Sequence, residues 1–113
     1  MNIVTFSIAD RAELGRSFVA AMEGEAQGNH ISFASVEQLW QTLARKRLEI
    51  IHAMTGQGVL AIREVARRVQ RDVKAVHSDV TALVKAGVLD KVDGGVVFPY
   101  DAVHVDFMLT KAA

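Results

Sequence analysis

The sequence has no cysteine, one proline and few aromatic residues, and each shortage narrows the kinds of protein that it can encode. Without cysteine there is no disulfide framework and no thiolate metal site. Aromatic residues make up 6% of the chain and hydrophobic residues 50%, so aliphatic side chains must form the core. No apolar run reaches the roughly 18 residues that a membrane span requires, and the N-terminus lacks the basic start of a signal peptide. We therefore expect a cytoplasmic protein, and 113 residues favour a single domain.

The net charge is zero, with 13 basic and 13 acidic residues, which argues against a protein that coats nucleic acid. The charges are unevenly distributed along the chain. Residues 36–71 carry seven Lys or Arg against three Glu, whereas residues 1–35 carry two Arg against four acids. This asymmetry is compatible with one basic face on a neutral molecule, although a solvated helix surface explains any single charge equally well.

The first 35 residues predict an extension made of two short strands and one helix. Residues 1–7 are rich in β-branched side chains, and residues 29–35 form a second extended segment. Between them, from Ser7 onward, one apolar stripe at helical spacing predicts a helix. Its members are Leu14, Phe18, Ala21 and Met22.

A single long helix is predicted over residues 36–54. Ser35 and Gln38 form a capping box at its start, and Gly56 and Gly58 follow its end. Apolar residues recur along it at intervals of three and four, interrupted only by Arg47. They are Val36, Leu39, Trp40, Leu43, Ile50, Ile51 and Met54. We assign Trp40 to the core or to a dimer interface.

Two shorter helices follow. The first spans residues 60–69 with Ile62, Val65, Ala66 and Val69 facing inward, but Ala61 stands where a Ser or Thr cap is expected, which costs about 1 kcal/mol. Gln70 and Arg71 form a tight connection, and Asp72 can cap the second helix. The buried stripe of that helix is predicted as Val73, Val76, Val80, Leu83 and Val84, with Gly87 as its C-terminal stop.

After Gly87 the apolar period falls to two, which indicates strands. Asp93-Gly94-Gly95 joins two β-branched runs and is a strong hairpin signal. Pro99 indicates that the second run is an edge strand or ends there. Residues 102–109 alternate again and predict a last strand, paired with residues 2–6 or 30–33 of the same or another subunit.

This order of elements predicts a winged helix-turn-helix. In that fold the first short helix braces the second, whose exposed face enters the major groove, and the hairpin reaches the flanking backbone. The fold class is therefore α+β, mainly α, in one domain of residues 1–113. It comprises an N-terminal helix and strand extension (1–35), a winged helix-turn-helix core (36–100) and a C-terminal strand and tail (101–113). Winged helices also serve as protein-interaction modules, so the order alone does not establish DNA binding.

Residues 45–107 resemble the MarR-like predicted transcriptional regulators of archaea and bacteria. The most specific stretch is an R-D-V-K-x-V-H-x-D-V-x-x-L run, matched by Arg71, Asp72, Val73, Lys74, Val76, His77, Asp79, Val80 and Leu83. The resemblance implies a DNA-binding regulator, usually dimeric, and in some members the antitoxin half of a toxin–antitoxin pair. Where relatives often carry Asn, Arg and Lys on the recognition helix, this chain has Ala75, Ser78 and Thr81, and Gln70 replaces the usual Gly. These departures lower the expected attraction for phosphate.

The candidate DNA contacts fall into three groups. On the exposed face of the second short helix, Ser78 and Thr81 are expected at base edges and Lys74 and Lys85 at phosphates. Arginines cluster around the brace helix and the turn, and those best placed for phosphates are Arg67, Arg68 and Arg71, beside Arg63. Lys91 lies on the hairpin. The alternatives are an ordinary solvent face and, for Arg68, an ion pair with Glu64. A further basic cluster is expected to contact either the same DNA or an acidic partner, and it consists of Arg45, Lys46 and Arg47.

No catalytic or metal site is predicted. His77 lies on the apolar stripe and is expected to be packed as a structural residue, and the four histidines are too far apart in sequence for a metal motif. Ser, His and Asp occur without a nucleophile elbow or a carboxylate pair, so we expect neither an enzyme nor a cofactor.

The expected partner is double-stranded DNA with a pseudo-palindromic operator, bound by a homodimer. Its dimer surface would come from the N-terminal helix, the long helix and the terminal strands, and an antitoxin would mask a toxin with its acidic N-terminal third. The rival hypothesis is an interaction module without useful DNA binding. Ion pairs between the arginines and Glu64, Asp72 or Asp79 would favour this second hypothesis.

Overall fold

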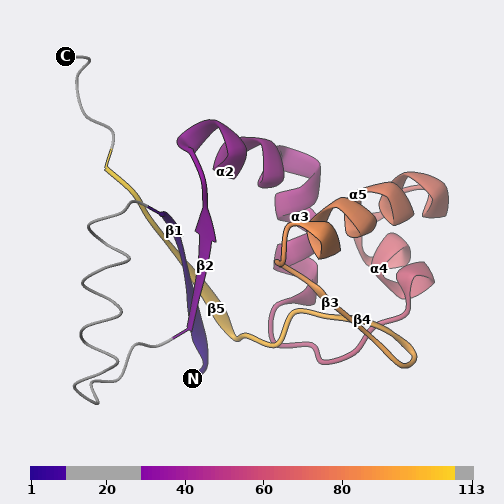
Figure 1. The fold of residues 1–113 in the computed structure, drawn as a ribbon. Coiled ribbons are helices and arrows are strands. Elements are labelled where there is room, and N and C mark those ends of the chain that lie inside the picture. Colours follow the sequence, from indigo (N-terminus) through magenta and orange to yellow (C-terminus); the bar gives the residue numbers. More distant parts are fainter. Residues whose placement is uncertain (10–28, 109–113) are drawn as a thin grey trace.

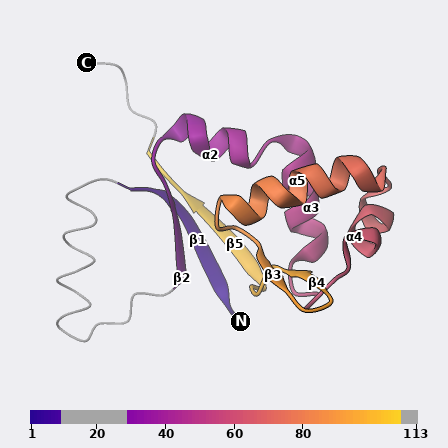
Figure 2. The same cartoon turned by 45° about the vertical axis from the view of Figure 1, so that its right-hand side comes forward.

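The computed structural model describes residues 1–9 and 29–108, which contain four helices and five strands. The helices are α2 (Val36–Thr42), α3 (Arg45–Met54), α4 (Ile62–Val69) and α5 (Val73–Lys85). The strands are β1 (Ile3–Ile8), β2 (Asn29–Phe33), β3 (Asp90–Val92), β4 (Gly95–Val97) and β5 (Ala102–Asp106). Figures 1 and 2 show β1, β2 and β5 on one side of the molecule and α4, α5 and the β3–β4 hairpin on the other. The predicted α+β class is confirmed.

A parallel sheet joins the two ends of the described chain. Its strand order is β2-β1-β5, and both neighbours run parallel to β1. Phe6 in β1 lies opposite Ile31 in β2 and Val105 in β5. The strands expected near residues 1–7, 29–35 and 102–109 are therefore confirmed, and the last pairs with the N-terminal strand of the same chain. Because β1 continues to Ile8, no helix begins at Ser7; the rest of that predicted helix lies outside the described residues.

The single helix expected over residues 36–54 is wrong, because the chain turns between α2 and α3. Leu43 ends α2, and Ala44 adopts an extended conformation with φ −53° and ψ 153°. The break frees the carbonyl of Gln41 from its helical partner, and the Arg47 guanidinium donates to that oxygen at 3.3 Å. Both short helices send their apolar side chains into one core, so the spacing of apolar residues continues across the turn and conceals it.

The predicted helix ends are confirmed where a specific cap was named. The Ser35 hydroxyl accepts from the Gln38 N–H at 3.1 Å, and Asp72 accepts from the Ala75 N–H at 3.3 Å. Ala61 supplies no side-chain cap to α4. At the other end of α5, Gly87 has φ 80°, and the Val88 N–H donates to the Leu83 carbonyl at 2.9 Å, which closes a Schellman motif.

The core fills the space between the sheet and the helices. Phe6 is fully buried and meets Phe33 and Phe98 edge-on, at ring-centroid distances of 5.7 and 6.4 Å. Val73 was expected in the buried stripe of α5 but is exposed, since it is the first residue of the helix and the buried stripe begins one turn later at Val76. Trp40 is 54% exposed and so is not a core residue; its ring meets Phe107 edge-on.

Candidate nucleic-acid interface

A tight turn places α5 against α4. Gln70 ends α4 in the left-handed conformation, with φ 56° and ψ 49°, and the Arg71 N–H donates to the Ala66 carbonyl at 3.1 Å. Gln70 adopts a conformation that glycine reaches at less cost. The turn is thus a short connection that fixes the direction of α5.

The β3–β4 hairpin is attached to the start of α4. Leu60 and Val96 exchange two backbone hydrogen bonds, each 2.9 Å long. Gly95, beside this pair, lies so close to the Leu60 carbonyl that an added Cβ atom would be 2.1 Å from the oxygen. The hairpin therefore lies beside α4 and α5 because a glycine permits the backbones to approach.

The exposed face of α5 is polar. Lys74, His77, Ser78 and Lys85 are exposed, and Thr81 is half-buried with its hydroxyl donating to the His77 carbonyl at 2.8 Å. The expectation that His77 packs as a structural residue is wrong. Val76, its neighbour, takes the buried position, and His77 lies at the edge of the stripe, where the helix turns toward solvent.

Two hollows flank this face of α5. The hairpin hollow, of about 350 Å³, lies between α5 and β3–β4; its polar lining consists of His77, Thr81, Lys85 and Lys91. The α3 hollow, of about 730 Å³, lies on the other side of α5, and its lining includes Ser78 of α5 and Arg45, Lys46 and Arg47 of α3. The structure thus places the predicted residues Ser78, Thr81, Lys85 and Lys91 around one helix face.

Two of the predicted phosphate contacts are paired within α4. Glu64 accepts from Arg67 through two nitrogens and from Arg68 Nε at 3.1 Å, and Arg68 also donates to the Gln57 side chain at 2.9 Å. These hydrogen bonds lower the pKa of Glu64 from 4.5 to about 2, and the same contact raises the pKa of Arg67. The Glu64–Arg68 alternative is therefore present in the structure.

We predict that the Glu64 carboxyl titrates with a midpoint near 2 in the folded protein. Because its folded pKa lies below the ordinary value, the stabilisation from the two arginines is complete above about pH 4.5 and is lost as the pH falls toward 2. Carbon-detected NMR of the side-chain carboxyl measures this midpoint. An Arg67→Ala/Arg68→Ala variant is the control and should return the midpoint toward 4.5; a wild-type midpoint already at that value would contradict the pairing.

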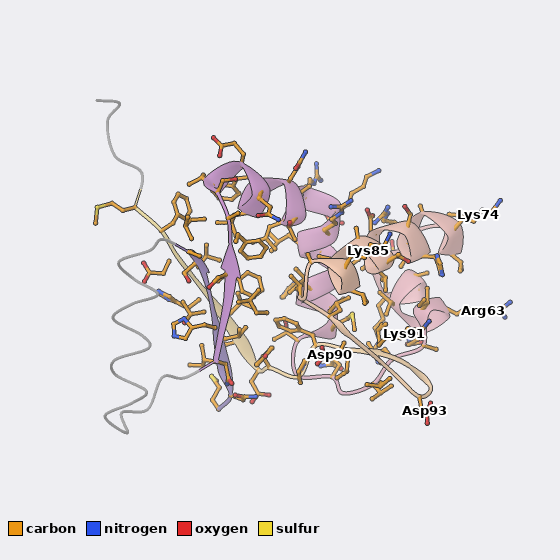
Figure 3. All side chains as sticks on the ribbon, in the orientation of Figure 1. Arg63, Lys74, Lys85, Asp90, Lys91 and Asp93 are labelled. Carbon is orange, nitrogen blue, oxygen red and sulfur yellow. The ribbon has the colours of Figure 1, made fainter. Side chains whose placement is uncertain are left out.

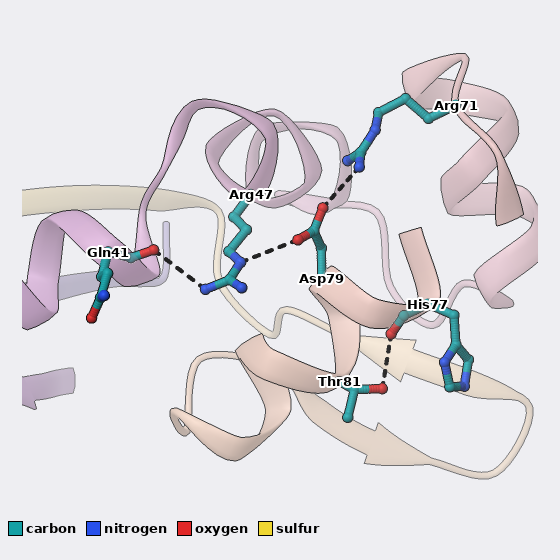
Figure 4. A network of polar contacts seen from close by, with 6 residues as sticks. All are labelled: Gln41, Arg47, Arg71, His77, Asp79 and Thr81. Carbon is teal, nitrogen blue, oxygen red and sulfur yellow. Dashed lines mark hydrogen bonds and ion pairs between the residues drawn. The ribbon is translucent and has the colours of Figure 1, made fainter. Parts of the chain in front are cut away.

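Arg71 is partly buried and paired with an acid of α5. Asp79 in α5 accepts from Arg71 Nη2 at 2.9 Å and from Arg47 Nε at 3.2 Å (Figure 4). The side chains of Arg71 and Asp79 are only 17% and 19% exposed. Within the described residues, Nη1 of Arg71 is shielded from solvent and has no hydrogen-bond partner. Arg71 thus links the turn to α5 and α3, and its ion pair with Asp79 neutralises its charge beside the α3 hollow that it also lines.

Five Lys or Arg side chains around α5 remain without an ion pair among the described residues. They are Lys46, Arg63, Lys74, Lys85 and Lys91. Figure 3 shows Lys74 and Arg63 pointing outward at the end of the molecule far from the sheet, with Asp93 at the tip of the hairpin. Sequence spacing favoured Arg67 and Arg68 over Arg63, yet Glu64 precedes those two by three and four residues, whereas no acid lies at those distances from Arg63. The positions of acids three and four residues away along α4 could therefore have indicated from the sequence that Arg67 and Arg68 are paired and that Arg63 is not.

A family model named HVO_A0114 matches residues 42–105, more than half of the chain. The chain belongs to the HVO_A0114 family. The matched stretch runs from the end of α2 to β5, so the HVO_A0114 region contains all of α5, the hairpin, the hairpin hollow and every residue of the α3 hollow except Gln41. Comparisons with curated proteins and with solved structures found no match. No helix in the described part of the chain has the length and apolarity needed to cross a membrane.

Proposed function

We propose that this protein is a sequence-specific DNA-binding transcriptional regulator with a MarR-like winged helix-turn-helix. In this proposal α5 is the recognition helix, α4 is the brace and β3–β4 is the wing. The observation that carries it is the exposed polar face of α5, where Lys74 and Lys85 have no ion pair within residues 1–9 and 29–108, with Lys91 of the hairpin beside it. A solvent-facing helix of this composition suits a major groove, where hydroxyls meet base edges and lysines meet phosphates.

The contacts divide by chemistry. Ser78 and Thr81 are assigned to base edges, and exposed His77 lies beside Thr81 on the side of α5 that faces the hairpin. The unpaired cations are assigned to phosphates, with Arg63 added to the lysines. Arg67 is largely exposed and can exchange its ion pair with Glu64 for one with DNA. Few phosphate contacts imply weak non-specific binding that falls with salt.

A protein-interaction module is the second candidate, and the arginine pairing favours it. Arg67 and Arg68 pair with Glu64, and Arg71 pairs with Asp79, so three expected phosphate contacts are already neutralised. The hairpin adds Asp90 and Asp93, which repel a DNA backbone. An antitoxin combines both activities, since it would bind its operator and mask a toxin protein with another surface.

The first experiment is fluorescence anisotropy with duplex DNA from upstream of the gene and with a scrambled duplex, each at two salt concentrations. We expect selective binding that a Lys74→Ala/Lys85→Ala variant weakens about 10- to 100-fold, with the slope of log Kd against log salt lower by about two per subunit. Both lysines are exposed and have no ion pair in the described part of the chain, so the variant should keep its fold.

The control for net charge is Ser32→Asp, an exposed position on β2 in the sheet. It adds one negative charge far from α5, which lowers the net charge by the same one unit as Lys74→Ala, and should change the affinity much less than Lys74→Ala alone. Equal, weak binding of both duplexes that disappears at modest salt, with no difference among the variants, would reject the regulator and leave the interaction module.

A further inference from the structure

We propose that two copies of this chain associate through the free edge of β5, forming one continuous sheet with three strands from each copy. The pairing is antiparallel and centred on His104. A dimer of this kind would give the proposed regulator two DNA-binding heads, but its basis is the sheet edge alone, and it can be tested without DNA.

The first observation is that β5 ends the sheet. Among the described strands it is bonded only to β1, so its outer edge carries backbone N–H and C=O groups without a strand partner. Such an edge is a template for pairing with another chain, and proteins commonly block it with proline, lysine or a bulge. β5 has the sequence Ala-Val-His-Val-Asp and contains no proline or lysine.

Symmetry restricts how two β5 strands can pair. In an antiparallel ladder, hydrogen-bonded and non-hydrogen-bonded residue pairs alternate, so a two-fold axis must pair one residue with its own copy. An axis at His104 pairs all five residues of the strand, whereas an axis at a neighbouring residue leaves part of the strand unpaired. With that register, Val103 of each copy lies opposite Val105 of the other.

The same register matches side chains on both faces of the strand. Val103 and Val105 lie on the face that also carries Val4 and Phe6, toward the helices. Two β-branched pairs opposite each other are favourable in a sheet. On the other face His104 meets its own copy, with Asp106 of the second copy as its diagonal neighbour. The strand is therefore complementary to itself, which identifies a second copy as its partner.

An apolar groove of about 560 Å³ lies beside this edge, between α3 and β5. Its apolar lining comes from Leu48, Ile51, Ala102 and Val103, and Leu48 is 51% exposed. Val105 is 41% exposed on the same face of β5. In the proposed pairing Val105 of the second copy lies opposite Val103, at the groove, so that it covers apolar surface that water now contacts.

The decisive experiment uses the absence of cysteine. A His104→Cys variant should form a disulfide-linked dimer under mild oxidation, because the two thiols lie directly opposite each other. Asp106→Cys, two residues along on the same exposed face, is the matched control. In this register its two copies are about 13 Å apart along the strands and cannot bridge. Equal cross-linking of the two variants would overturn the register.

Sedimentation velocity without DNA tests association itself. We expect the wild-type chain to dimerise and Val105→Asp to raise the dimer dissociation constant by at least about tenfold, since it places two carboxylates in the apolar groove. Val59→Asp is the control, because Val59 is similarly exposed but lies beside the hairpin. A wild-type monomer throughout the concentration series, or a Val105→Asp dimer as strong as wild type, would overturn the proposal. A dimer that binds no DNA contradicts only the regulator, and a monomer that binds DNA contradicts only this interface.

Discussion

A Gly95→Ala variant is expected to lose about 3–5 kcal/mol of unfolding free energy, because the added methyl group meets backbone atoms. The Cβ atom would lie 2.1 Å from the Leu60 oxygen and 2.6 Å from its carbonyl carbon. No rotamer relieves such a contact, so the hairpin and the segment before α4 must separate. That movement breaks the two hydrogen bonds between Leu60 and Val96 and exposes both of these buried side chains. Gly95 also has φ +148°, which disfavours any side chain.

Gly58→Ala separates the steric part of this effect from backbone strain. Gly58 has φ +73°, and its added Cβ atom meets nothing within 4 Å. The Gly58→Ala variant should therefore lose only roughly 1–2 kcal/mol of unfolding free energy, which is the cost of placing an alanine in the left-handed conformation. Urea denaturation followed by circular dichroism measures both variants. If Gly95→Ala loses no more unfolding free energy than Gly58→Ala does, the close approach of the hairpin to Leu60 is contradicted.

Local chemistry made much of the fold predictable. The Ser35 and Asp72 caps, the Gly87 stop and the hairpin turn each depend on residues within a few positions, so sequence spacing was enough to place them. The break after α2 was missed for a related reason. The spacing of apolar residues indicates which residues face the core. It does not reveal a turn after which the same residues still face the core.

Contacts between distant residues were beyond sequence spacing. Arg47 and Asp79 are 32 positions apart, and their ion pair depends on how α3 crosses α5. The parallel pairing of β1 with β5 joins segments almost 100 residues apart. Within the candidate site, spacing correctly placed Lys74, Ser78 and Lys85 on the exposed face of α5. It did not show that Arg71 is partly buried against Asp79, because that arrangement also involves Arg47 of α3, which is distant in sequence.

An Asp79→Ala variant is expected to lose about 3 kcal/mol of unfolding free energy, because it leaves two poorly exposed guanidinium groups without their acid. Asp79 accepts charge-assisted hydrogen bonds from Arg47 and Arg71, whose side chains are 30% and 17% exposed. Asp79→Asn keeps the shape and one acceptor oxygen, so it should lose less. Asp93→Ala, at the exposed tip of the hairpin, is the control and should stay within about 0.5 kcal/mol of wild type.

The cause of the loss can be tested by removing the charge that Asp79 leaves behind. If the penalty comes from a buried, unpaired Arg71, then Arg71→Met in the Asp79→Ala background should recover part of the stability, whereas Arg71→Met alone should destabilise the protein. A double-mutant cycle by urea denaturation gives the coupling energy. Additive effects would mean that water solvates these groups in the folded protein. A strong coupling would mean that the acid of the R-D-V-K-x-V-H-x-D stretch orients α5 against α3, and so sets the direction of the face proposed to read DNA.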